Sequence, residues 1–233
     1  MNRTYLNNIV HERTQGIVQQ GPFTGLKLCN YDNGCLGNKL LGSYESQLYA
    51  AIEQTINYQP DLVINLGCGE GYYGLGLAKR LPNVRNILID NAEHELINAL
   101  YNLQSNKLSN VELWNYADID VIQYIMRKYK KPFLFIDVEG YEITFLDQNI
   151  NSELVKSCII VECHDFQGIP ITQILNERFN DSHHVFNILD DLNKTSDHHA
   201  IKDLTKEEKN LLLSEGRPGV MNWLYMIPKK LIL

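Results

Sequence analysis

The sequence predicts an α/β fold: a doubly wound, mostly parallel sheet of seven strands with helices on both faces and a C-terminal antiparallel strand. Three observations predict it. Short apolar runs alternate with helical patterns five times between residues 61 and 179. Glycines gather where the first apolar run passes into a helix. Two more apolar runs, joined by a long polar connection, follow and suit an antiparallel pair beside a parallel sheet.

The composition fits one domain with an appendage. The chain has 233 residues, of which 44% are hydrophobic, and this is ample for one core. We predict a main domain over 43–233, an N-terminal extension over 1–42 that packs on it, and an insert at about 190–219. The net charge of −7 and the lack of a long basic run disfavour nucleic acid as the main partner.

Cysteine usage and hydropathy indicate the compartment. The five cysteines are odd in number and include no Cys-x-x-Cys pair, which argues against a disulfide framework or a zinc cage. The N-terminus is polar, and no apolar run approaches the length of a membrane span. We therefore expect a cytoplasmic protein with no membrane partner, and the sequence leaves homo-oligomer formation open.

The beginning of the chain reads as an extension followed by one helix. Residues 1–42 lack strong periodicity and are punctuated by glycine, although short pieces such as 23–29 could form strands. Apolar residues at helical spacing then predict a helix over 43–58, with Ser43 as its N-cap and Ser46 as a second candidate. This helix either closes over a bound ligand or simply covers an edge of the sheet.

A strand predicted over 61–66 runs into a glycine-rich turn, and a helix follows over 72–80. This order suits a nucleotide-like ligand, because glycines let the backbone approach it and the helix offers free N–H groups. A purely structural tight turn is the alternative.

Two ligand patterns overlap in this turn. Gly69 and Gly71, with Gly74, spell the G-x-G-x-x-G of dinucleotide binders. Gly67, Gly69 and Gly71 spell the tighter G-x-G-x-G of S-adenosylmethionine (SAM) binders. The apolar run ends before Gly67, and this favours the second pattern.

The next strand, predicted over 84–89, ends at Asp90, about 20 residues beyond the glycines. A carboxylate at this place can accept hydrogen bonds from both ribose hydroxyls of a nucleotide-like ligand. The alternative is that Asp90 caps the helix predicted over 92–106. The spacing and the strand-end position favour ribose binding.

A third strand, predicted over 111–116, leads to Asp118 at the same expected edge of the sheet. Its carboxylate could accept a hydrogen bond from an adenine amino group. It could equally cap the helix predicted over 121–130, and the sequence leaves both interpretations open.

A fourth strand, over 133–136, ends in three acids within six residues: Asp137, Glu139 and Glu142. Such carboxylates repel one another and prefer water, so a cation, a proton to abstract or backbone donors must favour keeping them. Glu142 is expected in the first turn of a short helix over 143–150, where the helix dipole favours an acid. Asp137 and Glu139 are the functional candidates.

A fifth strand, over 158–161, ends in Glu162, His164 and Asp165. His164 is poised near neutrality and is a candidate general base, although it could also be a hydrogen-bonding prop for a loop. Together with Asp137, this group could hold a divalent cation such as magnesium. The spacing permits a metal without demanding one.

The remaining elements are a helix over 171–179, a strand over 183–189, a helix near 205–213 inside the insert, and a last strand over 220–227. The insert helix has Thr205 as its N-cap and Glu208 as the capping-box partner.

Four stretches match motifs of a known family: Leu41-Gly-Ser-Tyr-Glu45, Asn65-Leu-Gly-Cys-Gly-Glu-Gly-Tyr-Tyr73, Ile136-Asp-Val-Glu-Gly-Tyr-Glu142 and Ile160-Val-Glu-Cys-His164. With them, roughly residues 41–165 resemble the FkbM-type SAM-dependent methyltransferases. The resemblance implies the Rossmann-like class I methyltransferase architecture. The acidic motif after the fourth strand is the most specific to that family, and the glycine turn alone indicates only the wider superfamily.

The resemblance also implies roles for individual residues. Gly67, Gly69 and Gly71 would cradle the methionine part of SAM, Asp90 would take the ribose, Asp118 the adenine, and Asp137 would lie beside the amino group and the methyl donor, with Tyr44 and Glu45 sealing the cofactor. The family mostly methylates oxygen, often on sugars or natural products. The acceptor would then be a small-molecule hydroxyl.

The implied reaction is an in-line displacement at the sulfonium methyl. His164 is the first candidate for the base, Glu162 or Asp137 the second, and Arg217 could bind an anionic part of the substrate. Two rivals remain at this point. One is an NAD-dependent oxidoreductase of the Rossmann type, and the other is a non-catalytic SAM-binding module, which the dense carboxylates disfavour.

Overall fold

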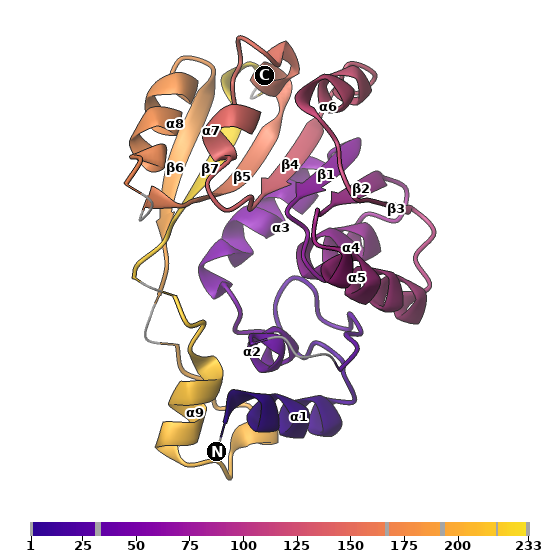
Figure 1. The fold of residues 1–233 in the computed structure, drawn as a ribbon, viewed down its shortest axis with the longest axis vertical. Coiled ribbons are helices and arrows are strands. Elements are labelled where there is room, and N and C mark those ends of the chain that lie inside the picture. Colours follow the sequence, from indigo (N-terminus) through magenta and orange to yellow (C-terminus); the bar gives the residue numbers. More distant parts are fainter. Residues whose placement is uncertain (1, 31–33, 166–167, 192–193, 218, 232–233) are drawn as a thin grey trace.

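The computed structural model describes the whole chain except residues 1, 31–33, 166–167, 192–193, 218 and 232–233 (Figure 1). Its centre is one seven-stranded sheet in the order β3-β2-β1-β4-β5-β7-β6. The strands are β1 (Leu62–Leu66), β2 (Arg85–Ile89), β3 (Val111–Trp114), β4 (Pro132–Ile136), β5 (Cys158–Cys163), β6 (His183–Leu189) and β7 (Asn222–Pro228). Strands β1 to β5 pair in parallel, whereas β7 is antiparallel to both β5 and β6. The predicted fold class is confirmed.

Helices cover both faces of the sheet, and one apolar cluster lies between the helices and the sheet on each face. The helices are α3 (Tyr49–Tyr58), α4 (Tyr72–Arg80), α5 (Glu93–Asn106), α6 (Ile119–Met126), α7 (Glu142–Phe145) and α8 (Ile171–Phe179), with 3-10 turns η2 (Ser152–Lys156) and η5 (Lys229–Leu231). One cluster joins α3, α4 and α5 to one face of the sheet, and the other joins α6 and α8 to the opposite face. Strands β1 and β4 are buried at every position between these layers, as their continuous apolar sequences require.

The parallel strands end at the same level, and this creates the edge that carries the site. The last residue of β1 pairs with the last residues of β2 and β4. Gly67, Asp90 and Asp137, which follow these strands, are therefore brought together. Strand β5 extends two residues beyond its pairing with β4, so that Glu162 and His164 reach the same edge. We call it the carboxyl edge.

The first 42 residues contain structure that the sequence pattern did not reveal. Helix α1 (Arg3–Thr14) buries two apolar residues, Leu6 and Val10, beside two polar ones, and so lacks a clear apolar stripe. The suggested strand over 23–29 is wrong, because this segment contributes only one isolated bridge, between Ile17 and Lys27.

The predicted helix over 43–58 is shorter than expected. A 3-10 turn, η1 (Ser46–Leu48), precedes α3, and neither predicted serine is an N-cap. Helix α2 (Leu36–Leu41) ends at Gly42, whose φ of 71° is left-handed. Ser43 donates its hydroxyl to the carbonyl of Asn38 in α2, and Glu45 has a φ of 44°, so the chain is still turning where the helix was expected to begin.

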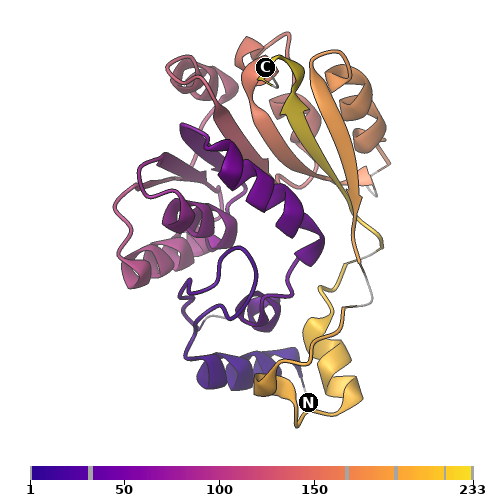
Figure 2. The same cartoon turned by 180° about the vertical axis from the view of Figure 1, so that it is seen from behind.

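The N-terminal segment and the insert lie together beyond the carboxyl edge. Helix α1 packs against α2 and against α9 (Lys206–Leu213), and the 3-10 turn η4 (His199–Ile201) also contacts α1. Figures 1 and 2 both place these helices at the end of the molecule to which β1 to β5 point. The capping box of α9 is confirmed. The predicted insert includes residues 192–193 and 218, which lie outside the described residues, and the division into domain, extension and insert stays a prediction.

The bounds of several strands and helices differ by a few residues from the predicted ones. Strand β3 ends at Trp114, α6 begins directly after Asp118, and α7 is a single turn instead of a helix over 143–150. Strand β5 extends beyond the predicted end at residue 161 and includes Glu162. The reason is that the apolar pattern stops before the hydrogen-bonded ladder does.

Gly67 should be the least replaceable glycine of the turn. Its φ is 70° and a Cβ here would lie 1.6 Å from the carbonyl oxygen of Asp137. Gly69 has a φ of 51° but its nearest neighbour would be 4.0 Å away, so it is a matched control for backbone strain. We expect Gly67→Ala to lower the free energy of unfolding by at least about 2 kcal/mol more than Gly69→Ala. Urea denaturation measures both, and equal losses would contradict the close approach.

Candidate active site

The backbone of the glycine turn is hydrogen-bonded to the ends of the neighbouring strands. Gly67 donates its N–H to the carbonyl of Ile89 at 2.9 Å, and Asp137 donates to Leu66 at 2.9 Å, so the turn is tied to β2 and β4. Gly71, with a φ of 88°, is the N-cap of α4 and supplies no side chain to cap it. The N–H groups of the first turn of α4 are therefore suited to bind a ligand.

Asp90 fixes the turn from the end of β2. One carboxylate oxygen accepts from the N–H of Gly69 at 2.8 Å and the other from the N–H of Ala92 at 2.9 Å. Each oxygen keeps a second lone pair. Ribose binding by Asp90 therefore stays a prediction that this geometry permits.

Asp118 is an exposed N-cap. Its carboxylate accepts from the backbone N–H of Val121 at 2.9 Å at the start of α6. The capping interpretation of the sequence is the one that the structure contains. A contact with adenine through a remaining lone pair stays a prediction.

The glycine turn is also held by a buried ion pair that the sequence did not predict. Lys39 of α2 pairs with Glu70, which lies between Gly69 and Gly71, and both side chains are almost fully buried. The Lys39 ammonium also lies 4.6 Å from the centre of the Tyr44 ring. A lysine in a segment without clear periodicity gave no signal of this long-range pairing.

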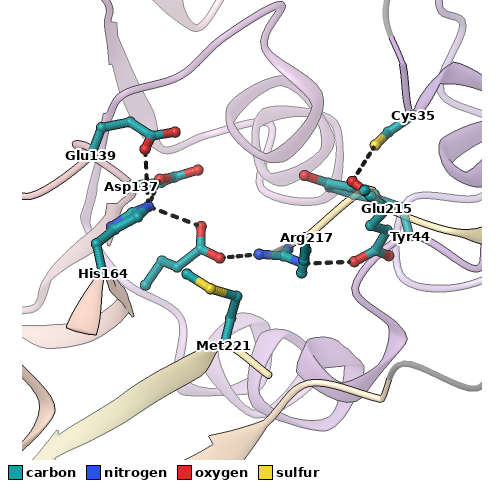
Figure 3. A pocket seen from close by; sticks show the side chains of 10 residues that line it. Cys35, Tyr44, Asp137, Glu139, His164, Glu215, Arg217 and Met221 are labelled. Atoms are coloured by element: carbon teal, nitrogen blue, oxygen red, sulfur yellow. Dashed lines mark hydrogen bonds and ion pairs between the residues drawn. The ribbon is translucent and has the colours of Figure 1, made fainter. Parts of the chain in front are cut away.

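A cavity of about 260 Å³ opens at the carboxyl ends of β4 and β5 (Figure 3). It is lined by Cys35, Tyr44, Asp137, Glu139, Glu162, His164, Glu215, Gly216, Arg217 and Met221. The three predicted catalytic side chains, Asp137, Glu162 and His164, thus meet in one cavity. Asp165 is turned to Thr172 and does not line it.

His164 is held by a buried carboxylate. Its Nδ1 lies 2.6 Å from Oε1 of Glu142, and the Glu142 side chain is 0% exposed. A carboxylate accepts a hydrogen and cannot donate one when ionised, so Nδ1 carries the proton and Nε2 faces the cavity. Sequence reasoning placed Glu142 correctly in the first turn of α7 but missed this contact. The one signal in the sequence that points to this contact is a third acid, Glu142, in the same motif as Asp137 and Glu139.

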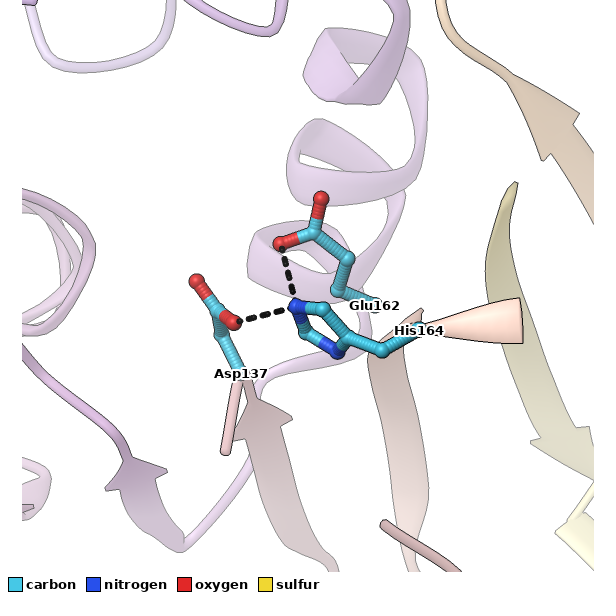
Figure 4. A group of neighbouring side chains, drawn as sticks. All are labelled: Asp137, Glu162 and His164. Carbon is cyan, nitrogen blue, oxygen red and sulfur yellow. Dashed lines mark ion pairs between the residues drawn. The ribbon is translucent and has the colours of Figure 1, made fainter. Parts of the chain in front are cut away.

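Three carboxylates surround the other ring nitrogen of His164. Nε2 lies 3.3 Å from Glu139 (Figure 3), and it lies 3.6 Å from Asp137 and 3.9 Å from Glu162 (Figure 4). This nitrogen can accept a proton from a group in the cavity, and the carboxylates stabilise the imidazolium that forms.

Arg217 joins four segments of the chain. Its Nη1 and Nη2 pair with Glu162 of β5 and with Glu45 before η1. Its Nε lies 3.0 Å from Glu215 and 3.2 Å from Asp190, which come from the two ends of the insert. Carboxylates of the protein thus take the place of the anionic substrate group that the sequence suggested for Arg217.

Glu45 is buried behind the cavity. It accepts hydrogen bonds from the hydroxyl of Tyr73 and from Arg217, while its neighbour Tyr44 lines the cavity. Contact of Glu45 with a cofactor stays a prediction. What it does here is complete the charge pairing of Arg217.

The crowding of acids changes their protonation. Burial, and then the carboxylates of Glu45 and Glu139, raises the pKa of Asp137 to about 7. Burial, with Asp137 and Glu45, raises the pKa of Glu162 to about 9 although Arg217 opposes the shift. Burial alone would lower the pKa of His164, but the bond to Glu142 and the nearby carboxylates outweigh it and raise the pKa.

The same atoms have some properties of a metal site. One ligand atom from each of Asp137, Glu162 and His164 lies within 4.8 Å of the others. Two carboxylates and an imidazole whose Nδ1 is fixed by a buried acid fit a divalent cation. One oxygen of Glu162 is already bound by Arg217, which weakens that fit.

The comparisons with known proteins define the class. The family described as "Methyltransferase domain" matches residues 61–217, more than half of the chain, and the protein belongs to it. The chain is therefore a class I SAM-dependent methyltransferase. No curated protein matches the sequence.

Solved structures of methyltransferases share the fold. The O-methyltransferase TomG of Streptomyces achromogenes, involved in tomaymycin synthesis and bound to SAM, is 12% identical with a TM-score of 0.54, covering 98% of this chain and 99% of that chain. An O-methyltransferase of Bacillus cereus bound to SAH is 15% identical with a TM-score of 0.52, covering 79% and 81%. At these identities the likeness shows the fold alone. Among the described helices, none is long and apolar enough to cross a membrane.

The stability of the ligand-free protein should fall as the pH rises. Asp137, Glu162 and His164 all have raised pKa values in the folded state, so the native protein keeps protons that the unfolded chain has released. The unfolded carboxyls ionise near pH 4, whereas the folded ones ionise near 7 and 9, and stability is lost across that window. We expect a loss of several kcal/mol between pH 5 and pH 9, because each proton that only the folded state keeps is worth about 1.4 kcal/mol per pH unit.

Urea denaturation at a series of pH values measures this loss. The double variant Asp137→Asn, Glu162→Gln should show a flatter profile, because its neutral groups cannot release protons. A wild-type profile that rises with pH through this window would contradict the assignment.

Proposed function

We propose that this methyltransferase is of the FkbM type and transfers the SAM methyl group to a hydroxyl of a small molecule such as a sugar or natural product. The observation that carries the proposal is the Glu142–His164 pair, which holds the His164 ring so that Nε2 faces the cavity at the carboxyl edge. The FkbM-like motifs supply these two residues and Asp137.

The cofactor would lie across the carboxyl edge beside the cavity. Its methionine part sits on the turn of Gly67, Gly69 and Gly71, and its ribose is bound by Asp90. The adenine then lies toward Asp118. Asp137 would accept a hydrogen bond from the amino group, next to His164.

The reaction is a single in-line displacement. The acceptor oxygen attacks the methyl carbon, the bond from that carbon to sulfur breaks, and the electron pair stays on sulfur as S-adenosylhomocysteine. The hydroxyl proton passes to Nε2 of His164, and Glu142 holds the ring in place and stabilises its positive charge. Glu162 and Asp137 are the second candidates for the base.

The two alternative functions that the sequence left open are no longer equally supported. Membership of the methyltransferase family speaks against an NAD-dependent oxidoreductase. A non-catalytic SAM-binding module would have no use for an imidazole with a fixed tautomer that faces a cavity. The experiments below therefore also test whether the protein binds SAM without transferring its methyl group.

Calorimetric titration tests the cofactor. We expect SAM to bind and NAD not to bind, and Asp90→Ala to weaken SAM binding by about tenfold or more, because two ribose hydrogen bonds are lost. Glu112→Ala, which removes an acid from β3, is the control and should leave the affinity unchanged. Binding of NAD instead of SAM would refute the proposed cofactor.

Turnover with an accepted hydroxyl substrate tests the base. We expect His164→Ala to lower kcat by about 10²–10⁴-fold while SAM binding stays near wild type. Glu142→Gln should lower kcat less and shift the pH profile, because it alters the proton affinity of His164. His184→Ala, an exposed histidine on β6, is the matched control. Full activity of His164→Ala would move the base role to Glu162 or Asp137.

A divalent cation at Asp137, Glu162 and His164 is a second way to activate the hydroxyl, and the metal group described above favours testing it. A bound cation would lower the pKa of the acceptor hydroxyl. Electron paramagnetic resonance of added Mn²⁺ separates the two mechanisms. With His164 acting as a base we expect no bound manganese and no effect of a chelator on turnover.

A further inference from the structure

Acidic side chains outnumber basic ones around the cavity. Among the described residues, the lining contains four acids and two basic side chains: Asp137, Glu139, Glu162, Glu215, Arg217 and His164. Behind this lining lie three more acids and one lysine: Glu45, Glu142, Asp190 and Lys194.

The basic groups of the cavity are already paired with acids. Each nitrogen of the Arg217 guanidinium contacts a carboxylate. Lys194 pairs with Glu215 and lies 3.7 Å from Asp190. A phosphate or carboxylate of an acceptor would have to displace one of these buried pairs and would then face the acids that remain.

The acids, in contrast, retain capacity to accept hydrogen bonds. Oδ1 of Asp137 is buried and has no hydrogen-bond partner among the described atoms. The Glu139 side chain is 79% exposed at the cavity and its carboxylate lies 3.3 Å from the ring nitrogen of His164. Asp137 suits the amino group of the cofactor, as proposed above, and the exposed Glu139 carboxylate beside the base suits a second ligand that donates hydrogen bonds.

The backbone of Glu139 supports a functional role for this side chain. Its φ is 50°, a left-handed conformation that costs free energy for a residue with a Cβ. Gly140 follows with a φ of 106°, so the loop turns back at once into α7. This turn places the Glu139 carboxylate over the cavity, where a glycine at position 139 would be less strained but could bind nothing.

We propose that the acceptor carries an ammonium group near the hydroxyl that is methylated, as an amino sugar or amino alcohol does, and that Glu139 binds it. This inference rests on the proposed function and names its substrate class. With the ammonium on Glu139, a neighbouring hydroxyl of the same molecule lies within reach of Nε2 of His164. Glu139 is then the residue that selects a positively charged acceptor over a neutral or anionic one.

Matched compounds test this charge preference. Glucosamine, ethanolamine and an aminocyclitol, each beside its N-acetyl and its phosphorylated counterpart, are titrated into the protein saturated with S-adenosylhomocysteine. We expect an ammonium compound to bind at least about tenfold more tightly than its N-acetyl counterpart. Glu139→Gln should remove this preference with little effect on cofactor binding. Glu177→Gln, an exposed acid on α8, is the control and should keep it.

Each other outcome overturns the inference. Equal or tighter binding of the neutral or phosphorylated counterparts would do so, as would a panel in which no ammonium compound binds. Tight binding of a phosphorylated compound only when Mg²⁺ or Mn²⁺ is present would assign the missing positive charge to a metal instead. Failure of S-adenosylhomocysteine to bind in the first titration would refute the proposed function separately, and the compounds can then be titrated without it.

Discussion

The contacts of one guanidinium group determine how this molecule is assembled around its site. Arg217 is the point at which the N-terminal segment, the sheet and both ends of the insert meet, through four acids that are almost fully buried. A buried acid without a partner is costly, so each of these segments depends on the same side chain. Arg217 therefore links the cavity wall opposite the strands to the sheet.

The sheet and this wall contribute different properties. The sheet supplies alignment, since parallel strands that end at one level bring the glycine turn, Asp90 and Asp137 together without any specific side-chain contact. The wall supplies charged side chains such as Glu215 and Arg217, and it closes one side of the cavity. His164 lies between them, held from the sheet side by Glu142 and surrounded on the cavity side by acids. The acids around this base favour its protonated form.

The features that could be predicted from the sequence are those that depend on local pattern or on strand order. The buried strands were evident because their apolar runs are continuous, and the meeting of Asp137, Glu162 and His164 followed from parallel pairing alone. Helix α1 was not evident, since half of its buried residues are polar. The partners of Lys39 and Arg217 were also out of reach, because these pairs join residues as far as 172 positions apart and nothing in the local sequence names them.

The buried pair of Lys39 and Glu70 has a consequence for the limits of the folding unit. The part of the chain that matches the methyltransferase family begins at residue 61, and it contains Glu70 and Arg217 but neither Lys39 nor Glu45. Cut at that boundary, the protein would lose the lysine that pairs with Glu70 and one of the four acids that contact Arg217. The segment before β1 is thus part of the core of the enzyme, and the borders of a sequence family are not the borders of an autonomous fold.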